Sequence, residues 1–320
     1  MTTSTAPVFI DAETVDALLD WPSVIEALRE GHKLPAGPTD SSFNIHRGRT
    51  LNNLSAWVDG LGGAVKSLSF FPDNPGRTPA METIQGVVLL FDDEHGAVKA
   101  VIDGVALTRW KTVGDSLLGS SLLAAPSPKT LLVIGSGAVG RGCATAYPKV
   151  FSSLERVLLW NRTPEKAAAL VETLQASSGV SASYEAATNL EQAVGAADII
   201  SCATFANDPI VQGAWLKEGQ HLDLIGAYQP DMREADDDAI RRSKIYIDNR
   251  EKTVEVSGEL MIPLAAGVIT EDDILGDLYR LCTEGPTPRS PSDITLYKNG
   301  GGAQLDLMTA DLIYRKFLER

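Results

Sequence analysis

The stretch that decides the fold is Leu131-Leu132-Val133-Ile134 followed directly by Gly135-Ser136-Gly137-Ala138-Val139-Gly140. A short apolar strand leads into a G-x-G-x-x-G turn, and a helix-compatible run follows from 141 to 150. In such a turn the first glycine permits a tight bend, the second lets backbone approach a pyrophosphate, and the third lets helix pack closely on strand. The helix N-terminus then offers unpaired N–H groups to phosphate oxygens. We therefore expect a dinucleotide to contact Gly135, Gly137, Ala138 and Val139.

The end of the next strand narrows the choice of dinucleotide. NAD-binding folds usually carry Asp or Glu about 20 residues past the glycines, where the carboxylate holds the ribose 2′-hydroxyl. Here the strand at 156–160 is followed by Asn161, Arg162 and Thr163. No carboxylate stands there to repel a 2′-phosphate, and the Arg162 guanidinium is placed to pair with one. The sequence therefore favours NADP(H) over NAD(H), with NAD(H) kept as an alternative.

Composition excludes several classes of protein. The chain has 320 residues, 44% of them hydrophobic, and a formal net charge of −14. This charge disfavours nucleic acid or an anionic membrane surface as a partner. The three cysteines are scattered without a C-x-x-C pair, and no two of the four histidines have metal-like spacing, so we expect no disulfide framework and no metal site. The polar start and the lack of a long apolar run predict a cytoplasmic protein.

The second half of the chain alternates strands with helices. Apolar strand patterns occur at 130–134, 156–160, 198–202, 221–225 and 244–248, and helices fit at 165–177 and 189–194. Such alternation is typical of a parallel, doubly wound sheet. The fold class is therefore α/β, with a Rossmann-like doubly wound nucleotide-binding domain at 113–294.

The N-terminal part has a different character. Residues 43–102 are rich in short alternating strands interrupted by Gly, Pro and Asn, and a helix is expected at 106–123. The closing helix, expected at 304–317, follows a Pro- and Ser-rich segment at 283–293 that we take as the return linker. We therefore expect a smaller α+β substrate-binding and dimerisation domain made of 1–112 and 295–320.

Motifs along nearly the whole chain together resemble the ornithine cyclodeaminase/mu-crystallin family. They are Val65-Lys66, Phe71-Pro72-Asp73-Asn74, Asp103-Gly104, Lys111-Thr112, the glycine turn, Trp160-Asn161-Arg162-Thr163, Asp198-Ile199-Ile200-Ser201-Cys202, Asp223-Leu224-Ile225-Gly226, Pro230-Asp231-Met232-Arg233-Glu234, Ser257-Gly258-Glu259-Leu260 and Tyr297-Lys298-Asn299-Gly300. The resemblance implies a homodimeric, two-domain enzyme that uses a nicotinamide cofactor.

Members of this family differ in chemistry, and one position helps to separate them. Cyclodeaminases and alanine dehydrogenases carry an acidic residue shortly after the glycine that corresponds to Gly226, where this chain has Tyr228. Tyrosine is a poor general base at neutral pH. The segments around Tyr228 and Lys111 instead look like the cyclic ketimine reductase branch. Asp231 and Glu234 are expected to cap and orient the following helix.

The resemblance also implies site residues. Lys66, the expected catalytic residue, would bind the substrate carboxylate together with Lys111, and Arg47 is the choice for an upstream arginine with the same task. Further cofactor contacts are expected at Thr112, Asn161, Arg162, Thr163, Ala203, Thr204, Gly226 and Asn299. The proton donor stays open, with Tyr228 as a candidate.

These observations predict NADPH-dependent reduction of a cyclic 2-imino acid. The substrate would be Δ1-pyrroline-2-carboxylate, with Δ1-piperideine-2-carboxylate as a second candidate, and the products L-proline and L-pipecolate. Three alternatives remain: an ornithine cyclodeaminase with bound NAD, an alanine dehydrogenase, and a non-catalytic NADPH-dependent binding protein. The chain itself leaves the ring size undecided.

Overall fold

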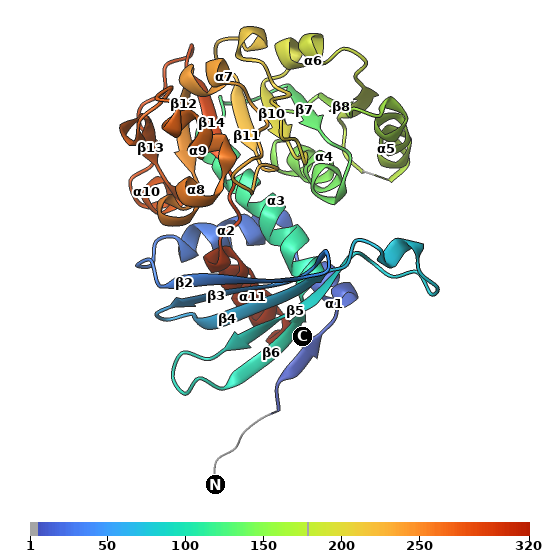
Figure 1. The fold of residues 1–320 in the computed structure, drawn as a ribbon, viewed down its shortest axis with the longest axis vertical. Helices are drawn as coiled ribbons and strands as arrows, with labels where there is room; N and C mark the ends of the chain where they lie inside the picture. Colours follow the sequence, from blue (N-terminus) through green and yellow to red (C-terminus); the bar gives the residue numbers. More distant parts are fainter. Residues whose placement is uncertain (1–5, 178) are drawn as a thin grey trace. The chain divides into compact units, whose positions relative to one another are not determined.

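The computed structural model of the protein describes residues 6–177 and 179–320, and it divides into two compact units (Figure 1). The first unit contains the described part of residues 1–114 together with Gly302–Arg320, and the second contains Asp115–Gly301. Residues 1–5 of the expected first domain lie outside the described residues. Because the chain leaves the first unit and returns to it, that unit is built from both ends of the sequence.

The first unit is built on a six-stranded sheet. In spatial order the strands are β1 (Val8–Ile10), β6 (Val98–Asp103), β5 (Ile84–Phe91), β4 (Gly62–Phe70), β3 (Arg49–Val58) and β2 (Thr39–His46). Strands β2 to β6 form an antiparallel meander, and β1 adds in parallel beside β6. A short 3₁₀ turn, η1 (Asn74–Gly76), interrupts the connection between β4 and β5.

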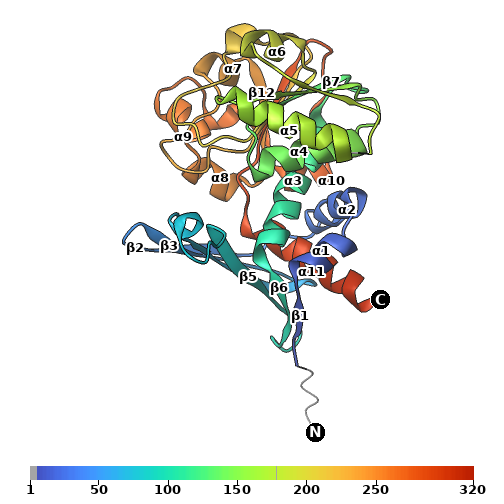
Figure 2. The same ribbon diagram turned by 90° about the vertical axis from the view of Figure 1, so that its right-hand side faces the viewer.

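Helices cover one face of this sheet. Helix α11 (Ala303–Leu318) crosses β3, β4 and β5, with α1 (Ala12–Leu18) and α2 (Trp21–Gly31) beside it (Figure 2). The caps explain where the first two helices begin, since the side chains of Asp11 and Asp20 accept hydrogen bonds from the backbone of the first turn. Residues on the covered face, such as Val88, Leu90 and Ile102, are buried.

The second unit contains an eight-stranded, entirely parallel sheet. Its order is β13 (Ile274–Gly276), β12 (Ser243–Ile247), β14 (Ile294–Lys298), β11 (His221–Leu224), β10 (Ile199–Cys202), β7 (Thr130–Ile134), β8 (Arg156–Trp160) and β9 (Ser183–Ala186). Starting at β7, the chain runs outward through β8 and β9, then returns to β10 on the other side. The doubly wound α/β fold expected from the strand–helix alternation is confirmed.

Helices connect these strands. They are α3 (Gly104–Leu123), α4 (Ala138–Val150), α5 (Pro164–Ser177), α6 (Leu190–Ala196), α7 (Asp237–Arg241), α8 (Arg250–Val256), α9 (Gly258–Ala265) and α10 (Leu278–Thr283), with the 3₁₀ turns η2 (Gly213–Trp215) and η3 (Glu271–Asp273). The division between the two units falls inside α3.

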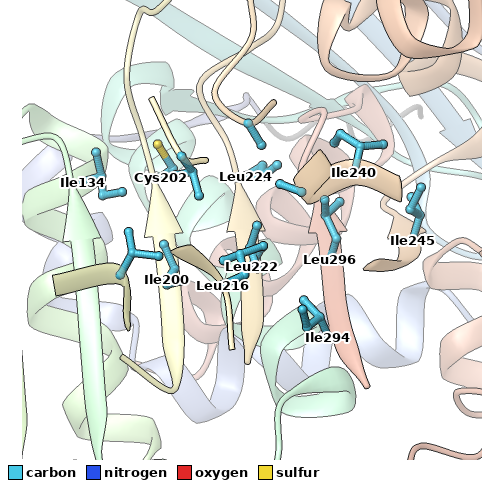
Figure 3. Packing of buried hydrophobic residues seen from close by; sticks show 14 of the residues in the cluster. Ile134, Ile200, Cys202, Leu216, Leu222, Leu224, Ile240, Ile245, Ile294 and Leu296 are labelled. Carbon is cyan, nitrogen blue, oxygen red and sulfur yellow. The ribbon is translucent and has the colours of Figure 1, made fainter. Parts of the chain in front are cut away.

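The core of the second unit lies along the central strands. Side chains of β7, β10, β11 and β14, among them Ile134, Ile200, Leu222 and Leu296, pack together (Figure 3). Every residue of these four strands is buried, which is the pattern of a parallel sheet covered on both faces. This rigid sheet fixes where each strand ends, and therefore where its following loop begins.

The unit boundaries differ from the expected domain boundaries at 112/113 and 294/295. Strand β14 pairs with β11 and β12 in the second sheet, so the chain returns to the first unit only after Gly301. The Pro- and Ser-rich segment leads into this central strand. Strands β9 and β13 had no strong alternating pattern and were not expected.

Candidate active site

The glycine turn between β7 and α4 has the geometry of a phosphate cradle. Gly135 has φ +107°, a conformation that side chains other than glycine rarely adopt. A Cβ at Gly140 would lie 2.0 Å from the carbonyl oxygen of Gly135, so only glycine lets α4 pack this closely on β7. A Cβ at Gly137 would meet no atom within 4 Å, which leaves open space beside the turn. The three glycines thus fit the three roles expected of them.

The N-terminus of α4 faces this open space without a side-chain cap. Gly137 is the N-cap residue, and the first intrahelical bond runs from the Arg141 N–H to the Gly137 carbonyl. The N–H groups of Ala138 and Val139 belong to the first turn, where no intrahelical acceptor exists. Together with the helix dipole they form a site suited to an anion such as a pyrophosphate.

The end of β8 places three expected cofactor residues beside the glycine turn. The Asn161 amide donates to the Ser136 hydroxyl, and its oxygen accepts a bond of 3.0 Å from the Thr163 N–H. Asn161 therefore ties the end of β8 to the glycine turn. Arg162 and Thr163 are exposed, so their side chains are accessible to a ligand at this edge.

The loops after β10 and β11 lie on the other side of β7. The Ala203 N–H donates to the Ile134 carbonyl at 2.9 Å, which extends the sheet by one residue. Gly226 packs against the next loop so closely that a Cβ would lie 1.9 Å from the Thr204 carbonyl oxygen. Asn299, after β14, is buried and donates to the Ser116 hydroxyl at 3.0 Å. These expected cofactor residues therefore share the carboxyl edge of the sheet, where nucleotides bind in such folds.

The buried carboxylate of Asp223 connects several elements next to the same edge of the sheet. Asp223 accepts hydrogen bonds from Ser116 (2.7 Å), Tyr147 (2.8 Å) and Ser201 (2.7 Å). Burial raises the pKa of Asp223 to about 6, and the three donors oppose the shift. With three fixed donors, this carboxylate links α3, α4 and β10 and is not available for proton transfer to a ligand.

In the first unit the two expected substrate lysines meet at one carboxylate. The Lys66 ammonium on β4 lies 2.9 Å and 2.7 Å from the two carboxylate oxygens of Asp306, and the Lys111 ammonium on α3 lies 3.7 Å from one of them. The side chains of Lys66, Lys111 and Asp306 are only 5%, 3% and 2% exposed. We call these three residues the lysine cluster.

The lysine cluster brings two buried ammonium groups to one carboxylate. Burial lowers the pKa of Lys66 to about 8, while Asp306 raises it and Lys111 lowers it further. Two neighbouring ammonium groups suit a small carboxylate ligand, which accepts charge-assisted hydrogen bonds from both.

The structure does not bring Arg47 to this cluster. Arg47 lies in the turn between β2 and β3, exposed and with φ +51°. Lys66 pairs with Leu54, five residues along β3 from Arg49, so the turn is about 17 Å or more away at ~3.4 Å per residue. The Arg49 guanidinium instead lies over the Phe71 ring, 5.3 Å from its centre. Thr112, next to Lys111 on α3, is half-buried.

Two residues belong to these sites in roles that the sequence analysis did not predict. Asp306 sits in the first turn of α11, a helix that also carries Asp311, so no local signal marks it. Glu234 was expected to cap a helix, but Asp236 caps α7. Its carboxylate instead accepts hydrogen bonds from Thr204 and Gly226.

The candidate proton donor Tyr228 is about half exposed. Its ring meets Phe205 edge-on, with 6.1 Å between ring centres.

Comparison with known proteins places these features in a family. The model of the ornithine cyclodeaminase/mu-crystallin family matches residues 29–320. The chain belongs to that family. The resemblance inferred from the motifs is therefore confirmed.

Individual relatives match over nearly the full chain. A Δ1-pyrroline-2-carboxylate reductase of Paracoccus denitrificans is 43% identical over 313 residues, which cover 98% of both chains. The ketimine reductase mu-crystallin of Mus musculus is 32% identical and covers 97% of both. Both names are those of reductases, in agreement with the oxidoreductase expected from the motifs.

A solved structure shares the fold. The Δ1-pyrroline-2-carboxylate reductase of Thermococcus litoralis, in complex with NADH and L-proline, superposes with a TM-score of 0.88 at 26% identity, over 98% of each chain. Among the described residues, no helix is long and apolar enough to span a membrane. The same part of the chain holds no group of three or more His, Cys, Asp or Glu side chains suited to a metal ion.

Proposed function

We propose that the protein reduces a cyclic 2-imino acid with a nicotinamide cofactor, converting Δ1-pyrroline-2-carboxylate to L-proline and Δ1-piperideine-2-carboxylate to L-pipecolate. The lysine cluster is the observation that carries this proposal. Its two deeply buried ammonium groups, both beside Asp306, suit a ligand with one carboxylate. The second unit supplies the nucleotide cradle that such a reduction requires.

The relatives support the choice of reaction. The Paracoccus relative is named for Δ1-pyrroline-2-carboxylate reduction, and the Thermococcus structure pairs the reduced cofactor with the expected product. We therefore take the ligand of the glycine turn, Asn161 and the loops after β10 and β11 to be a nicotinamide cofactor. When bound, it supplies a hydride to the carbon of the C=N bond.

The residues of the chain have simpler tasks. Lys66 and Lys111 bind the carboxylate by charge-assisted hydrogen bonds and so fix the position of the adjacent C=N carbon. Burial of the cluster excludes water from that carboxylate and strengthens the pairing. The imine nitrogen of such rings binds a proton from water, so addition of one hydride to the protonated imine gives the secondary amine. A dedicated acid on the protein is then not required.

We propose a preference for NADP(H), with NAD(H) accepted less well. The support is the exposed Arg162 guanidinium beside the end of β8, together with the lack of Asp or Glu at 161–163. An arginine at this place pairs with a 2′-phosphate, and Thr163 can donate a further hydrogen bond to it. The ratio of kcat/KM for NADPH and NADH decides this point.

We also propose a homodimer formed through the uncovered face of the six-stranded sheet. Paired positions place Phe9, Val101, Leu89 and Val65 in a row across β1, β6, β5 and β4 on the face opposite Lys66. Phe9 is 65% exposed, and the other three are only partly buried. An apolar row on a sheet face that no helix of the described chain covers is typical of a protein interface. A second copy supplies the same apolar row in return.

A cytoplasmic location completes the proposal. Its support is that the buried Cys143 and Cys202 are free thiols, as expected in a reducing compartment.

An NADPH-oxidation assay tests the reaction. We expect turnover with five- and six-membered cyclic imino acids, and none with pyruvate plus ammonia. Ammonia release from L-ornithine without added cofactor would show a cyclodeaminase instead. Lys66→Met should raise KM for the imine at least tenfold while NADPH binding is retained, because only the carboxylate anchor is lost.

Lys99→Met is the matched control for this test, since Lys99 is a partly buried lysine on β6 of the same sheet, over the Tyr314 ring. Lys99→Met should leave both KM for the imine and the binding of NADPH unchanged. Equal effects of the two substitutions would contradict the anchoring role.

A further inference from the structure

One buried glutamate joins the two loops that border the nicotinamide half of the nucleotide site. The Glu234 carboxylate accepts bonds from the Thr204 N–H (2.7 Å) and hydroxyl (2.9 Å) on one oxygen, and from the Gly226 N–H (2.6 Å) on the other. Thr204 follows β10, and Gly226 follows the adjacent β11. A single side chain therefore holds both loops at the carboxyl edge of the sheet.

The close approach of the two loops depends on this arrangement. A Cβ on Gly226 would lie 1.9 Å from the Thr204 carbonyl oxygen and 2.6 Å from a Glu234 oxygen. Glycine at position 226 leaves the space for this approach. The Glu234 carboxylate supplies hydrogen-bond acceptors for the N–H groups of Thr204 and Gly226. All three bonds run from a donor to the carboxylate, so an ionised glutamate satisfies each of them.

The backbone of Glu234 is itself held from two sides. The Glu259 carboxylate accepts bonds from the Glu234 N–H (2.7 Å) and the Ala235 N–H (2.9 Å). The Glu234 carbonyl accepts bonds from Ile210 (2.9 Å) and Val211 (2.8 Å). The side chain therefore cannot follow the loops if they move, and the loops are fixed to a rigid point.

A buried lysine lies near this pair of glutamates. Glu234, Glu259 and Lys298 are fully buried, and the Lys298 ammonium donates to the carbonyls of Leu224 and Asn299 at 3.0 Å each. Burial and the neighbouring Glu234 raise the pKa of Glu259 to about 7, and Lys298 opposes the shift. Lys298 thus offsets part of the negative charge of the two carboxylates while it secures the ends of β11 and β14.

The position of the loops along the sheet indicates which half of the cofactor they serve. The glycine turn at β7 takes the pyrophosphate, and Asn161 to Thr163 after β8 lie on the ribose 2′-position side. The loops after β10 and β11 lie on the opposite side of β7, which leaves them the nicotinamide half. This step rests on the proposed function, since it takes the ligand to be a nicotinamide dinucleotide.

We propose that Glu234 is a positioning residue for the nicotinamide: it fixes the Thr204 and Gly226 loops against which that ring binds, and it leaves the adenosine half unaffected. The Glu234 side chain is available for this role because Asp236, and not Glu234, caps α7.

Binding of a truncated ligand tests the proposal, with affinities measured by titration calorimetry. ADP-ribose keeps the adenosine and pyrophosphate of NADH but lacks the nicotinamide. Glu234→Gln replaces one acceptor oxygen by an amide N–H that faces another donor, so at least one loop is released. We expect the Kd of NADH to rise at least tenfold and the Kd of ADP-ribose to stay within twofold.

Two further variants complete the experiment. Glu234→Asp keeps the charge with a shorter reach and should restore part of the NADH affinity. Asp231→Asn, an exposed carboxylate of the same motif, is the matched control and should change neither affinity.

The outcomes separate the two proposals. If Glu234→Gln weakened the binding of both ligands equally, or of neither, the proposed role of Glu234 would be overturned. The proposed function would not be affected by that result. Failure of both Glu234 variants to fold, beside a folded Asp231→Asn, would assign Glu234 to the fold and also overturn its proposed role. Wild-type protein that binds neither ligand would instead overturn the proposed function.

Discussion

Replacing Asp306 by Asn should change the pH dependence of imine reduction. In the intact cluster the carboxylate lies within 3 Å of the Lys66 ammonium and opposes both burial and the nearby Lys111. Without that negative charge, the two effects that lower the pKa of Lys66 from its usual value remain. The pKa of Lys66 therefore falls below its present value of about 8.

The size of the effect follows from Coulomb's law. Two unit charges about 3 Å apart interact by roughly 5 kcal/mol at an effective dielectric constant of 20, and one pKa unit corresponds to about 1.4 kcal/mol. Even a quarter of that interaction lowers the pKa of Lys66 by about one unit. At pH 8 the protonated fraction then falls from about one half to about one tenth, so kcat/KM for the imine falls about fivefold there.

The assay is the pH profile of kcat/KM for the imine at saturating NADPH. In the proposed function the protonated lysine binds the carboxylate, so the wild-type profile should decline as pH rises through about 8, and the decline in Asp306→Asn should begin at least one pH unit lower. Titration of the substrate itself is the same in both assays. Asp311→Asn, another largely buried carboxylate of α11 that pairs with Arg315, is the control and should keep the wild-type profile. Superimposable profiles of Asp306→Asn and wild type would refute the reasoning.

Four further predictions concern other parts of the chain. Arg162→Ala should raise KM for NADPH at least tenfold and leave KM for NADH within twofold, as steady-state kinetics would show; equal losses would exclude a 2′-phosphate contact. Gly137→Val should fold normally, because its side chain meets open space, yet weaken ADP-ribose binding at least tenfold in calorimetry. Gly140→Ala should lower the melting temperature instead, because its Cβ would lie 2.0 Å from a backbone oxygen, and an unchanged melting temperature would contradict that clash. Leu89→Glu should disrupt the proposed dimer and give a folded monomer in light scattering, and a variant that stays dimeric would place the interface elsewhere.

The nucleotide half of the fold was predictable because its signals are local. The glycine turn, the apolar strands and the caps lie within a few residues of one another, and Gly135, Gly137 and Gly140 fit their expected roles in the structure. Fully buried strands also leave a continuous apolar run, which is easy to recognise.

The missed residues depend on contacts between distant parts of the chain. Lys66 and Asp306 are 240 positions apart, and the sequence carries no sign that a carboxylate in the closing helix meets a lysine on β4. Glu234 sits in a motif that also suits helix capping, so the local interpretation was plausible and wrong. Arg47 was chosen by region alone, and the structure places it at the tip of a hairpin.

The discontinuous first unit has a consequence for biosynthesis. Its sheet begins at Val8, but the helix that covers that sheet and carries Asp306 ends at Leu318, after the whole of the second unit. A chain emerging from the ribosome therefore completes the nucleotide unit while the first sheet still lacks its covering helix. Loss of all of α11 through an early stop codon or a tail-trimming protease would leave the lysines without the Asp306 carboxylate, while the second unit could still form.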